Sequence, residues 1–273
     1  MPPTRVESHY SRGDLETTLL RALESAGLDP DNLHPDDLAP VDEFHIRGSE
    51  ATREMIDLAG FGAKDDVLDA GCGIGGPSRQ LLLNCGCRVT GLDLTREYCE
   101  LARKLAERLG LGDRVAYHQG DAQSMPFAEN AFDGVWTQHM AMNVADKGSL
   151  YDEIRRVLRP GGRLAMYEIV AGPGGDVHFP VPWARSPEIS HLTTAEDLEG
   201  ELQARGFQPR HWNDATEPAA AFFSAMLERV EETGPPPLGL HILLGPDMKA
   251  MGANMLRNLE EDRIRVLQVV MDG

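Results

Sequence analysis

The stretch VLDAGCGIGGPSRQL, residues 67–81, decides the fold of this chain. It begins with a short apolar run, passes through a glycine-rich turn and ends in a segment suited to a helix. Gly71, Gly73 and Gly76 match the pattern G-x-G-x-x-G, which many nucleotide-binding α/β folds share. On its own this pattern is a weak indication, and the residue that discriminates is Asp69, two positions before the first glycine.

A carboxylate at Asp69 argues against a dinucleotide cofactor. The pyrophosphate of a dinucleotide lies against this turn and the start of the following helix, where Asp69 would repel it. An ammonium group would be attracted to the same position. The sequence therefore favours a cofactor that carries an amine and no phosphate, and disfavours a nicotinamide-dependent oxidoreductase.

Short apolar runs alternate with helical patterns on both sides of this stretch. Strand-and-helix alternation of this kind is typical of a parallel sheet with helices on both faces. The expected architecture is therefore a doubly wound α/β sheet. We expect its strands at residues 67–70, 89–92, 115–117, 134–137 and 164–169, with a later pair at 207–212 and 264–271.

Residues 1–60 are expected to form an appended helical segment that acts as a lid. Apolar residues at helical spacing predict a helix over residues 14–26, and Ser49 is expected to start another that ends near Gly60. The proline-rich and acidic stretch between these two helices is expected to run along the surface as an irregular loop.

Residues 61–273 are expected to hold the sheet, with a helical cap inserted at about 214–260 before the last strand. Phe222, Phe223 and Met226 lie at helical spacing in this insertion. Because such a stripe is more often core than ligand site, we expect these three side chains in the core.

Two further acids follow predicted strands. Asp93 lies 93 − 71 = 22 residues beyond the first glycine, close to the spacing of an acid that accepts hydrogen bonds from ribose hydroxyls. Asp121 follows the third strand and is suited to accept a hydrogen bond from an adenine amino group. With Asp69, these acids converge on the crevice where open α/β sheets bind ligands. Taken alone, each of these acids is also compatible with a purely structural role, because Asp is common in turns.

The motifs VLDAGCGIGG, GLDLT, GDAQSMPF, FDGVW and RRVLRPGGRL occur in one order along the chain. In this order and spacing the chain resembles class I S-adenosylmethionine-dependent methyltransferases over about residues 50–170. The resemblance implies a Rossmann-like sheet of seven strands with the last antiparallel, and S-adenosylmethionine, which has an amine and no phosphate, as the cofactor. By matching position, the implied cofactor-binding residues are Asp69, Gly71, Gly73, Asp93, Leu94, Asp121, Ala122 and Gln138.

A narrower resemblance comes from GCGIGGPSR, QHMAMNV and VPWA, which are similar to small-molecule enzymes of the sarcosine/dimethylglycine N-methyltransferase and tocopherol or quinone methyltransferase type. His139 directly follows the fourth strand and is the candidate general base, since histidine titrates near neutral pH. The alternative is a packed histidine that only shapes the pocket.

The acceptor site is expected between the lid and the loop after the fifth strand. Tyr10, His45 and Arg47 are the candidate lid residues, and a lid excludes water from the reaction. Trp183 and Arg185 lie in the loop, where Arg185 is suited to hold a carboxylate.

The resulting functional prediction is methyl transfer to a small molecule, with N-methylation of a sarcosine- or dimethylglycine-like amine that carries a carboxylate as the preferred acceptor chemistry. O- or C-methylation of an aromatic or quinone-like metabolite is the alternative. A non-catalytic S-adenosylmethionine-binding module is the alternative from another class. No metal is expected.

Charge and composition limit the partners of the chain. Its 273 residues include 26 Lys and Arg against 44 Asp and Glu, a formal net charge of −18. An acidic chain is a poor binder of nucleic acid and of anionic membrane surfaces, so neither partner is expected. The first residues show no secretory leader and the four cysteines have no metal-ligand spacing, so a cytoplasmic protein is expected. The sequence does not indicate an oligomeric state.

Overall fold

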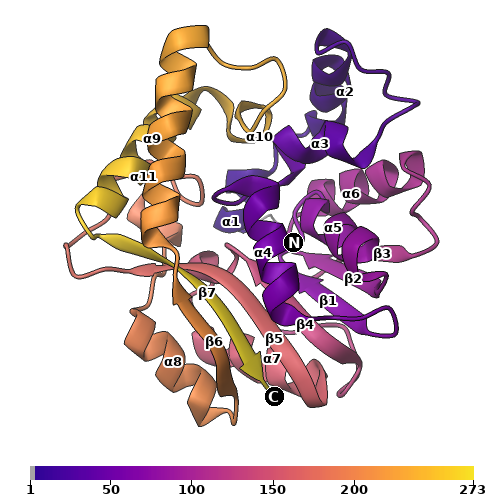
Figure 1. The fold of residues 1–273 in the computed structure, drawn as a ribbon, viewed down its shortest axis with the longest axis vertical. Helices are drawn as coiled ribbons and strands as arrows, with labels where there is room; N and C mark the ends of the chain where they lie inside the picture. Colours follow the sequence, from indigo (N-terminus) through magenta and orange to yellow (C-terminus); the bar gives the residue numbers. More distant parts are fainter. Residues whose placement is uncertain (1–3) are drawn as a thin grey trace.

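The computed structural model describes residues 4–273, and its centre is a seven-stranded sheet (Figure 1). The strand order is β3-β2-β1-β4-β5-β7-β6. β7 runs antiparallel to β5 and β6, whereas the other neighbouring strands are parallel. The expected doubly wound α/β sheet with an antiparallel last strand is confirmed. The strands are β1 (Asp66–Ala70), β2 (Arg88–Asp93), β3 (Val115–Gln119), β4 (Phe132–Gln138), β5 (Leu158–Ala171), β6 (Gln208–Asp214) and β7 (Ile264–Asp272).

Helices cover both faces of the sheet because alternate residues of each strand point to opposite sides. In β1, Val67 belongs to one apolar cluster and Leu68 to the other. The first cluster includes residues of α4, α5 and α6, and the second includes residues of α7 and α8. These helices are α4 (Gly48–Ala59), α5 (Gly76–Cys85), α6 (Arg96–Arg108), α7 (Lys147–Val157) and α8 (Ala195–Ala204).

The N-terminal segment holds three more helices, α1 (Arg5–Tyr10), α2 (Leu15–Ser25) and α3 (Pro35–Asp42). α3 lies in the stretch that we expected to be an irregular loop, so that prediction is wrong. Pro35 occupies the first turn of α3, where a missing N–H breaks no helical hydrogen bond, and the His34 side chain caps this helix.

The predicted insertion before the last strand contains α9 (Thr216–Thr233), α10 (His241–Leu244) and α11 (Met248–Glu260). α9 and α11 lie side by side, and α10 contacts α2 (Figure 1). We call α9, α10 and α11 the cap. The cap therefore lies next to the N-terminal helices. Residues 4–273 also contain three short 3-10 helices, η1 (Ala141–Asn143), η2 (Pro187–Ile189) and η3 (Gly245–Asp247).

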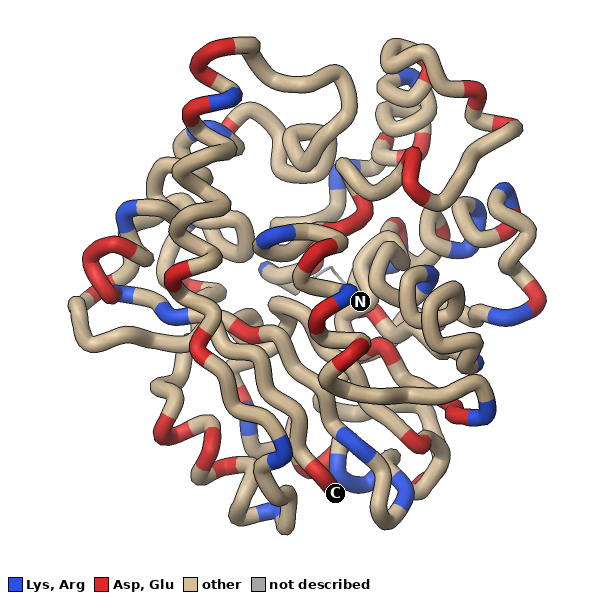
Figure 2. The backbone as a smooth tube through the Cα atoms, in the orientation of Figure 1, with Lys and Arg blue, Asp and Glu red and all other residues tan. Residues whose placement is uncertain are grey.

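Acidic residues occur along the whole tube in Figure 2, from the N-terminal helices to the C-terminal strands, and basic residues lie among them. Among the helices of residues 4–273, none combines the length and apolar content needed to cross a bilayer.

Candidate active site

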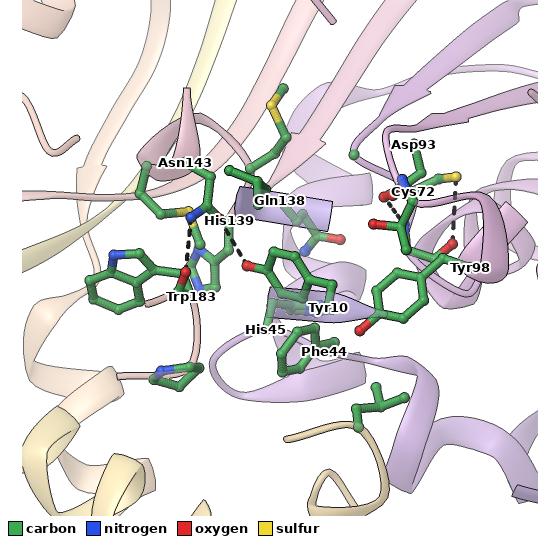
Figure 3. Close-up of a pocket in the computed structure, with 18 of the residues that line it drawn as sticks. Tyr10, Phe44, His45, Cys72, Asp93, Tyr98, Gln138, His139, Asn143 and Trp183 are labelled. Atoms are coloured by element: carbon green, nitrogen blue, oxygen red, sulfur yellow. Dashed lines mark hydrogen bonds between the residues drawn. The ribbon is translucent and has the colours of Figure 1, made fainter. Parts of the chain in front are cut away.

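A cavity of about 410 Å³ lies at the carboxyl ends of β1 to β4, where open α/β sheets bind their ligands (Figure 3). Its volume is in the range of small-molecule sites. The turns that follow the strands line one part of it. The N-terminal segment, the loop after β5 and the cap line the rest.

The cavity brings together all but two of the residues predicted from the sequence. Arg47 and Arg185 are the two that do not line it. The predicted residues that line it are Asp69, Gly71, Gly73, Asp93, Leu94, Asp121, Ala122, Gln138, His139, Tyr10, His45 and Trp183.

The glycine-rich turn leaves open space at one position and packs tightly at another. Gly71 and Gly73 both have positive φ, at 81° and 54°. A Cβ atom on Gly71 would collide with the side chain of Met140, whereas a Cβ atom on Gly73 would meet nothing within 4 Å. Gly71 is therefore needed for packing, and Gly73 exposes its backbone to the cavity.

Asp93 is held at the rim of the cavity by backbone amides. Its Oδ2 accepts a hydrogen bond from the Gly73 amide at 2.9 Å, and its Oδ1 accepts one from the Thr95 amide at 2.8 Å. A carboxylate oxygen accepts more than one hydrogen bond, so both oxygens keep capacity for a ligand. This geometry fits a ribose, which offers two adjacent hydroxyl donors.

Asp121 and Asp69 are held differently. Asp121 is exposed, and its Oδ1 accepts a hydrogen bond from the Gln123 amide at 2.8 Å. Asp69 is 1% exposed and accepts a hydrogen bond from the Ser78 hydroxyl at 2.5 Å. Burial raises the pKa of Asp69 to about 7. A cation in the cavity would favour the ionised form of this carboxyl group.

The side-chain amide of Gln138 is oriented by two neighbours. Trp136 Nε1 donates to Gln138 Oε1 at 3.1 Å, and Gln138 Nε2 donates to Thr52 Oγ1 at 3.4 Å. His45 Nε2 lies 2.8 Å from the same hydroxyl oxygen and 2.9 Å from the Gly48 carbonyl oxygen. His45, which the sequence predicted as a lid residue, therefore supports the cavity wall.

His139 differs from His45 because its ring nitrogens have no hydrogen-bond partner within residues 4–273. Its ring stacks on Tyr167 with centroids 4.8 Å apart, and its backbone has a φ of 49°. Burial, with a smaller contribution from His45, lowers the pKa of His139 to about 3. The imidazole is therefore neutral at physiological pH, so the near-neutral titration expected from the sequence is wrong. One of its two buried nitrogens keeps an unused acceptor position.

Asn143 joins three segments over the cavity (Figure 3). The Tyr10 hydroxyl donates to Asn143 Oδ1 at 2.8 Å, and Asn143 Nδ2 donates to the Trp183 carbonyl at 2.9 Å. The indole of Trp183 is buried and donates to the Ser190 hydroxyl at 2.9 Å. Asn143 lies in the motif QHMAMNV, but sequence reasoning gave it no role because the motif does not show which of its side chains face the cavity.

The cap supplies the apolar part of the cavity. Phe222, Phe223 and Met226 line it, so the expectation that these side chains serve the core alone is wrong. An amphipathic pattern shows that a helix has an apolar face but not whether that face meets a core or a cavity. Within the described residues the lining contains no Lys or Arg.

Arg185, predicted to hold an acceptor carboxylate, and Arg47, predicted as a lid residue, both have partners outside the cavity, so neither prediction fits the structure. Arg185 Nε donates to Asp247 Oδ2 at 3.1 Å, so it links the loop after β5 to the cap. Arg47 bonds to Glu54 at 2.6 Å and to Glu50 at 2.8 Å, beside the start of α4. Both guanidinium groups are taken by carboxylates of the protein itself.

Comparison with known proteins gives the family. Residues 68–166 match the family model described as "Methyltransferase domain". These residues form a class I methyltransferase domain. The predicted family is thereby confirmed for these residues, and solved methyltransferases of this fold include a complex with S-adenosylmethionine.

Individual relatives match longer parts of the chain than the family model does. "Methyltransferase GfsG" of Streptomyces halstedii is 36% identical over 163 residues, which are 58% of this chain and 56% of that protein. The match therefore spans little more than half of GfsG. The "27-O-demethylrifamycin SV methyltransferase" of Amycolatopsis mediterranei is 27% identical over 211 residues, covering 74% of this chain and 75% of that protein. The crystal structure of the [4+2]-cyclase SpnF superposes on this chain with a TM-score of 0.71 at 23% identity. The match covers 100% of this chain and 98% of the SpnF chain, which shows a shared fold.

Proposed function

We propose that this protein transfers a methyl group from S-adenosylmethionine to a hydroxyl group of a small, largely apolar molecule. The observation that carries the proposal is the division of the cavity. Acidic residues line it at the strand ends, apolar residues of the cap line the opposite part, and among the described lining residues there is no Lys or Arg.

The acidic part suits the cofactor. Asp93 would accept from the ribose hydroxyls, Asp121 with Ala122 would contact the adenine, and the open backbone at Gly73 would leave room for the methionine part. When bound, S-adenosylmethionine supplies an electrophilic methyl group on a sulfonium centre. A positive ligand is attracted by the surrounding carboxylates.

The apolar part suits an acceptor without charge. A carboxylate acceptor would be buried with no cation in the lining to pair with it, which is costly. This disfavours the sarcosine-like amine and favours the alternative acceptor chemistry, in which an aromatic or quinone-like metabolite is methylated. The Amycolatopsis relative is named as a methyltransferase of an O-demethyl compound, which is in line with a hydroxyl acceptor.

His139 is the residue that we assign to the acceptor hydroxyl. His139 lines the cavity, and its neutral ring has an acceptor nitrogen that is buried and has no partner among the described residues. A hydroxyl group that donates to this nitrogen would be oriented for transfer, and the nitrogen would take its proton as the new O–C bond forms.

Titration calorimetry with S-adenosylmethionine, S-adenosylhomocysteine and NAD tests the cofactor. We expect the first two to bind, and Asp93→Ala to weaken them by about 10- to 150-fold, since a hydrogen bond to a charged group contributes about 1.5–3 kcal/mol. Asp113→Ala, at an exposed acid outside the cavity, is the matched control. Equal affinities of the two folded variants would contradict the ribose assignment.

Formation of S-adenosylhomocysteine with a panel of apolar alcohols and phenols, their methyl ethers, and sarcosine tests the transfer. We expect turnover only with free hydroxyl groups, and a loss of about 10²- to 10⁴-fold in kcat for His139→Asn. Asn tolerates the positive φ at this position, so the backbone is preserved. Turnover of sarcosine would overturn the acceptor class, and cofactor binding without any transfer would favour a non-catalytic module.

A further inference from the structure

Two cap residues face each other at the apolar end of the cavity. Met226 lies on α9 and Gly252 on α11, the two helices lie side by side, and both residues line the cavity (Figure 1). A Cβ atom built on Gly252 would lie 2.9 Å from Met226 Cε. Carbon atoms pack at about 3.5–4.0 Å, so Gly252 leaves the space that the end of the Met226 side chain needs.

The helix context makes the glycine unusual. Gly252 is buried inside α11 without a positive φ, so its backbone conformation is one that any residue adopts. Glycine is less favourable than alanine inside a helix. The backbone therefore gives no reason for glycine at this position, whereas the contact with Met226 does.

The neighbouring side chains allow this contact to change. Met248, Met251 and Met255 of α11 also line the cavity. Methionine has three rotatable bonds and fills irregular spaces, so a displaced Met226 can be accommodated without moving the helices. Met226 itself lines the cavity.

We propose that the Met226–Gly252 contact sets how long an apolar acceptor the cavity admits. The inference rests on the proposed function, because it assigns the apolar part of the cavity to the acceptor. A side chain at position 252 would push Met226 into the cavity and shorten it. Truncation of Met226 would lengthen it.

A binding series measures this length without methyl transfer. Straight-chain 1-alkanols from 1-hexanol to 1-hexadecanol displace the neutral fluorescent probe N-phenyl-1-naphthylamine from the full chain, with and without saturating S-adenosylhomocysteine. Affinity should rise by about fourfold for each methylene group until the cavity is full. The chain length at which the rise stops reports the depth of the cavity.

Gly252→Ala is expected to lower this limiting chain length, and Met226→Ala to raise it by about two to three methylene groups, since three side-chain atoms are lost beyond Cβ. The double variant should return to at least the wild-type limit. Gly200→Ala is the matched control, because Gly200 also lies inside a helix, α8, lies outside the cavity, and a Cβ atom there meets nothing within 4 Å.

An unchanged limit in folded Met226→Ala would overturn the proposal, as would an equal shift in Gly200→Ala. A wild-type chain that binds neither the probe nor any alkanol would also overturn it. The readout needs no methyl transfer, so a protein that shows these shifts but methylates nothing would refute the proposed function alone.

Discussion

Replacement of Glu168 by Gln is expected to make the fold less sensitive to rising pH. Glu168 lies buried in β5, where its Oε1 accepts a hydrogen bond from the Thr137 hydroxyl at 3.0 Å. Its Oε2 has no hydrogen-bond partner within residues 4–273. Burial raises the pKa of this carboxyl group from 4.5 to about 7.

The sign of the effect follows from proton binding. Between pH 4.5 and about 7 the folded protein keeps the Glu168 proton that the unfolded chain has released. The contribution of Glu168 to stability is therefore full below pH 4.5 and falls as the pH rises through about 7. For one carboxyl group with these two pKa values, the free energy of unfolding falls by about 2.5 kcal/mol between pH 5 and pH 8.

Urea unfolding at pH 5, 6, 7 and 8 measures this loss in the wild type and in Glu168→Gln. The glutamine keeps an acceptor oxygen for Thr137 and cannot ionise, so the stability of the variant relative to wild type should increase by about 2.5 kcal/mol from pH 5 to pH 8. Glu232→Gln, at an exposed acid of α9, is the control and should follow the wild type. If the Glu168→Gln and wild-type curves stay parallel, the buried carboxyl group is not the cause and the reasoning is refuted.

Two more predictions concern charged contacts around the site. Arg79 Nη2 and Asp42 Oδ2 form a buried ion pair at 2.6 Å, so Arg79→Met, which leaves a buried carboxylate alone, should lower the free energy of unfolding by about 3–5 kcal/mol in urea titrations. Arg185→Ala removes an ion pair whose side chains are about half exposed and should change it by less than about 1 kcal/mol; similar losses in both variants would contradict the role of burial. Glu97 accepts hydrogen bonds from the backbone amides of Arg12, Gly13 and Leu15, so Glu97→Ala should speed limited proteolysis before α2. An unchanged cleavage rate would show that these bonds do not hold the N-terminal segment in place.

The cofactor part of the site could be predicted from the sequence because its residues follow strands. Asp69, Asp93, Asp121 and Gln138 each lie at or just after the end of a strand, and parallel neighbouring strands end at the same edge of the sheet. Local order along the chain is then enough to place these side chains together.

Tyr10, His45 and Trp183 were predicted near the acceptor, but the contacts that hold this part of the site together could not be predicted in this way. Tyr10, Asn143 and Trp183 meet over the cavity from positions up to 173 residues apart, through hydrogen bonds that no local pattern encodes. Arg185 shows the same limit, since its predicted role depended on a free guanidinium group. Asp247, 62 residues further along the chain, occupies that group in the folded protein.

The state of His139 links the architecture of the cavity to the release of product. If His139 takes the hydroxyl proton as we propose, its pKa of about 3 returns the ring to the neutral form, which accepts a hydrogen bond. A hydroxyl acceptor satisfies this buried nitrogen, whereas the methyl ether that forms from it has no O–H to donate. An unpaired buried polar group is costly, so we expect the proposed site to bind the hydroxyl acceptor more tightly than its methyl ether. The methyl ethers of turned-over alcohols should therefore be weak inhibitors of the wild type, and this preference for the alcohol should shrink in His139→Asn.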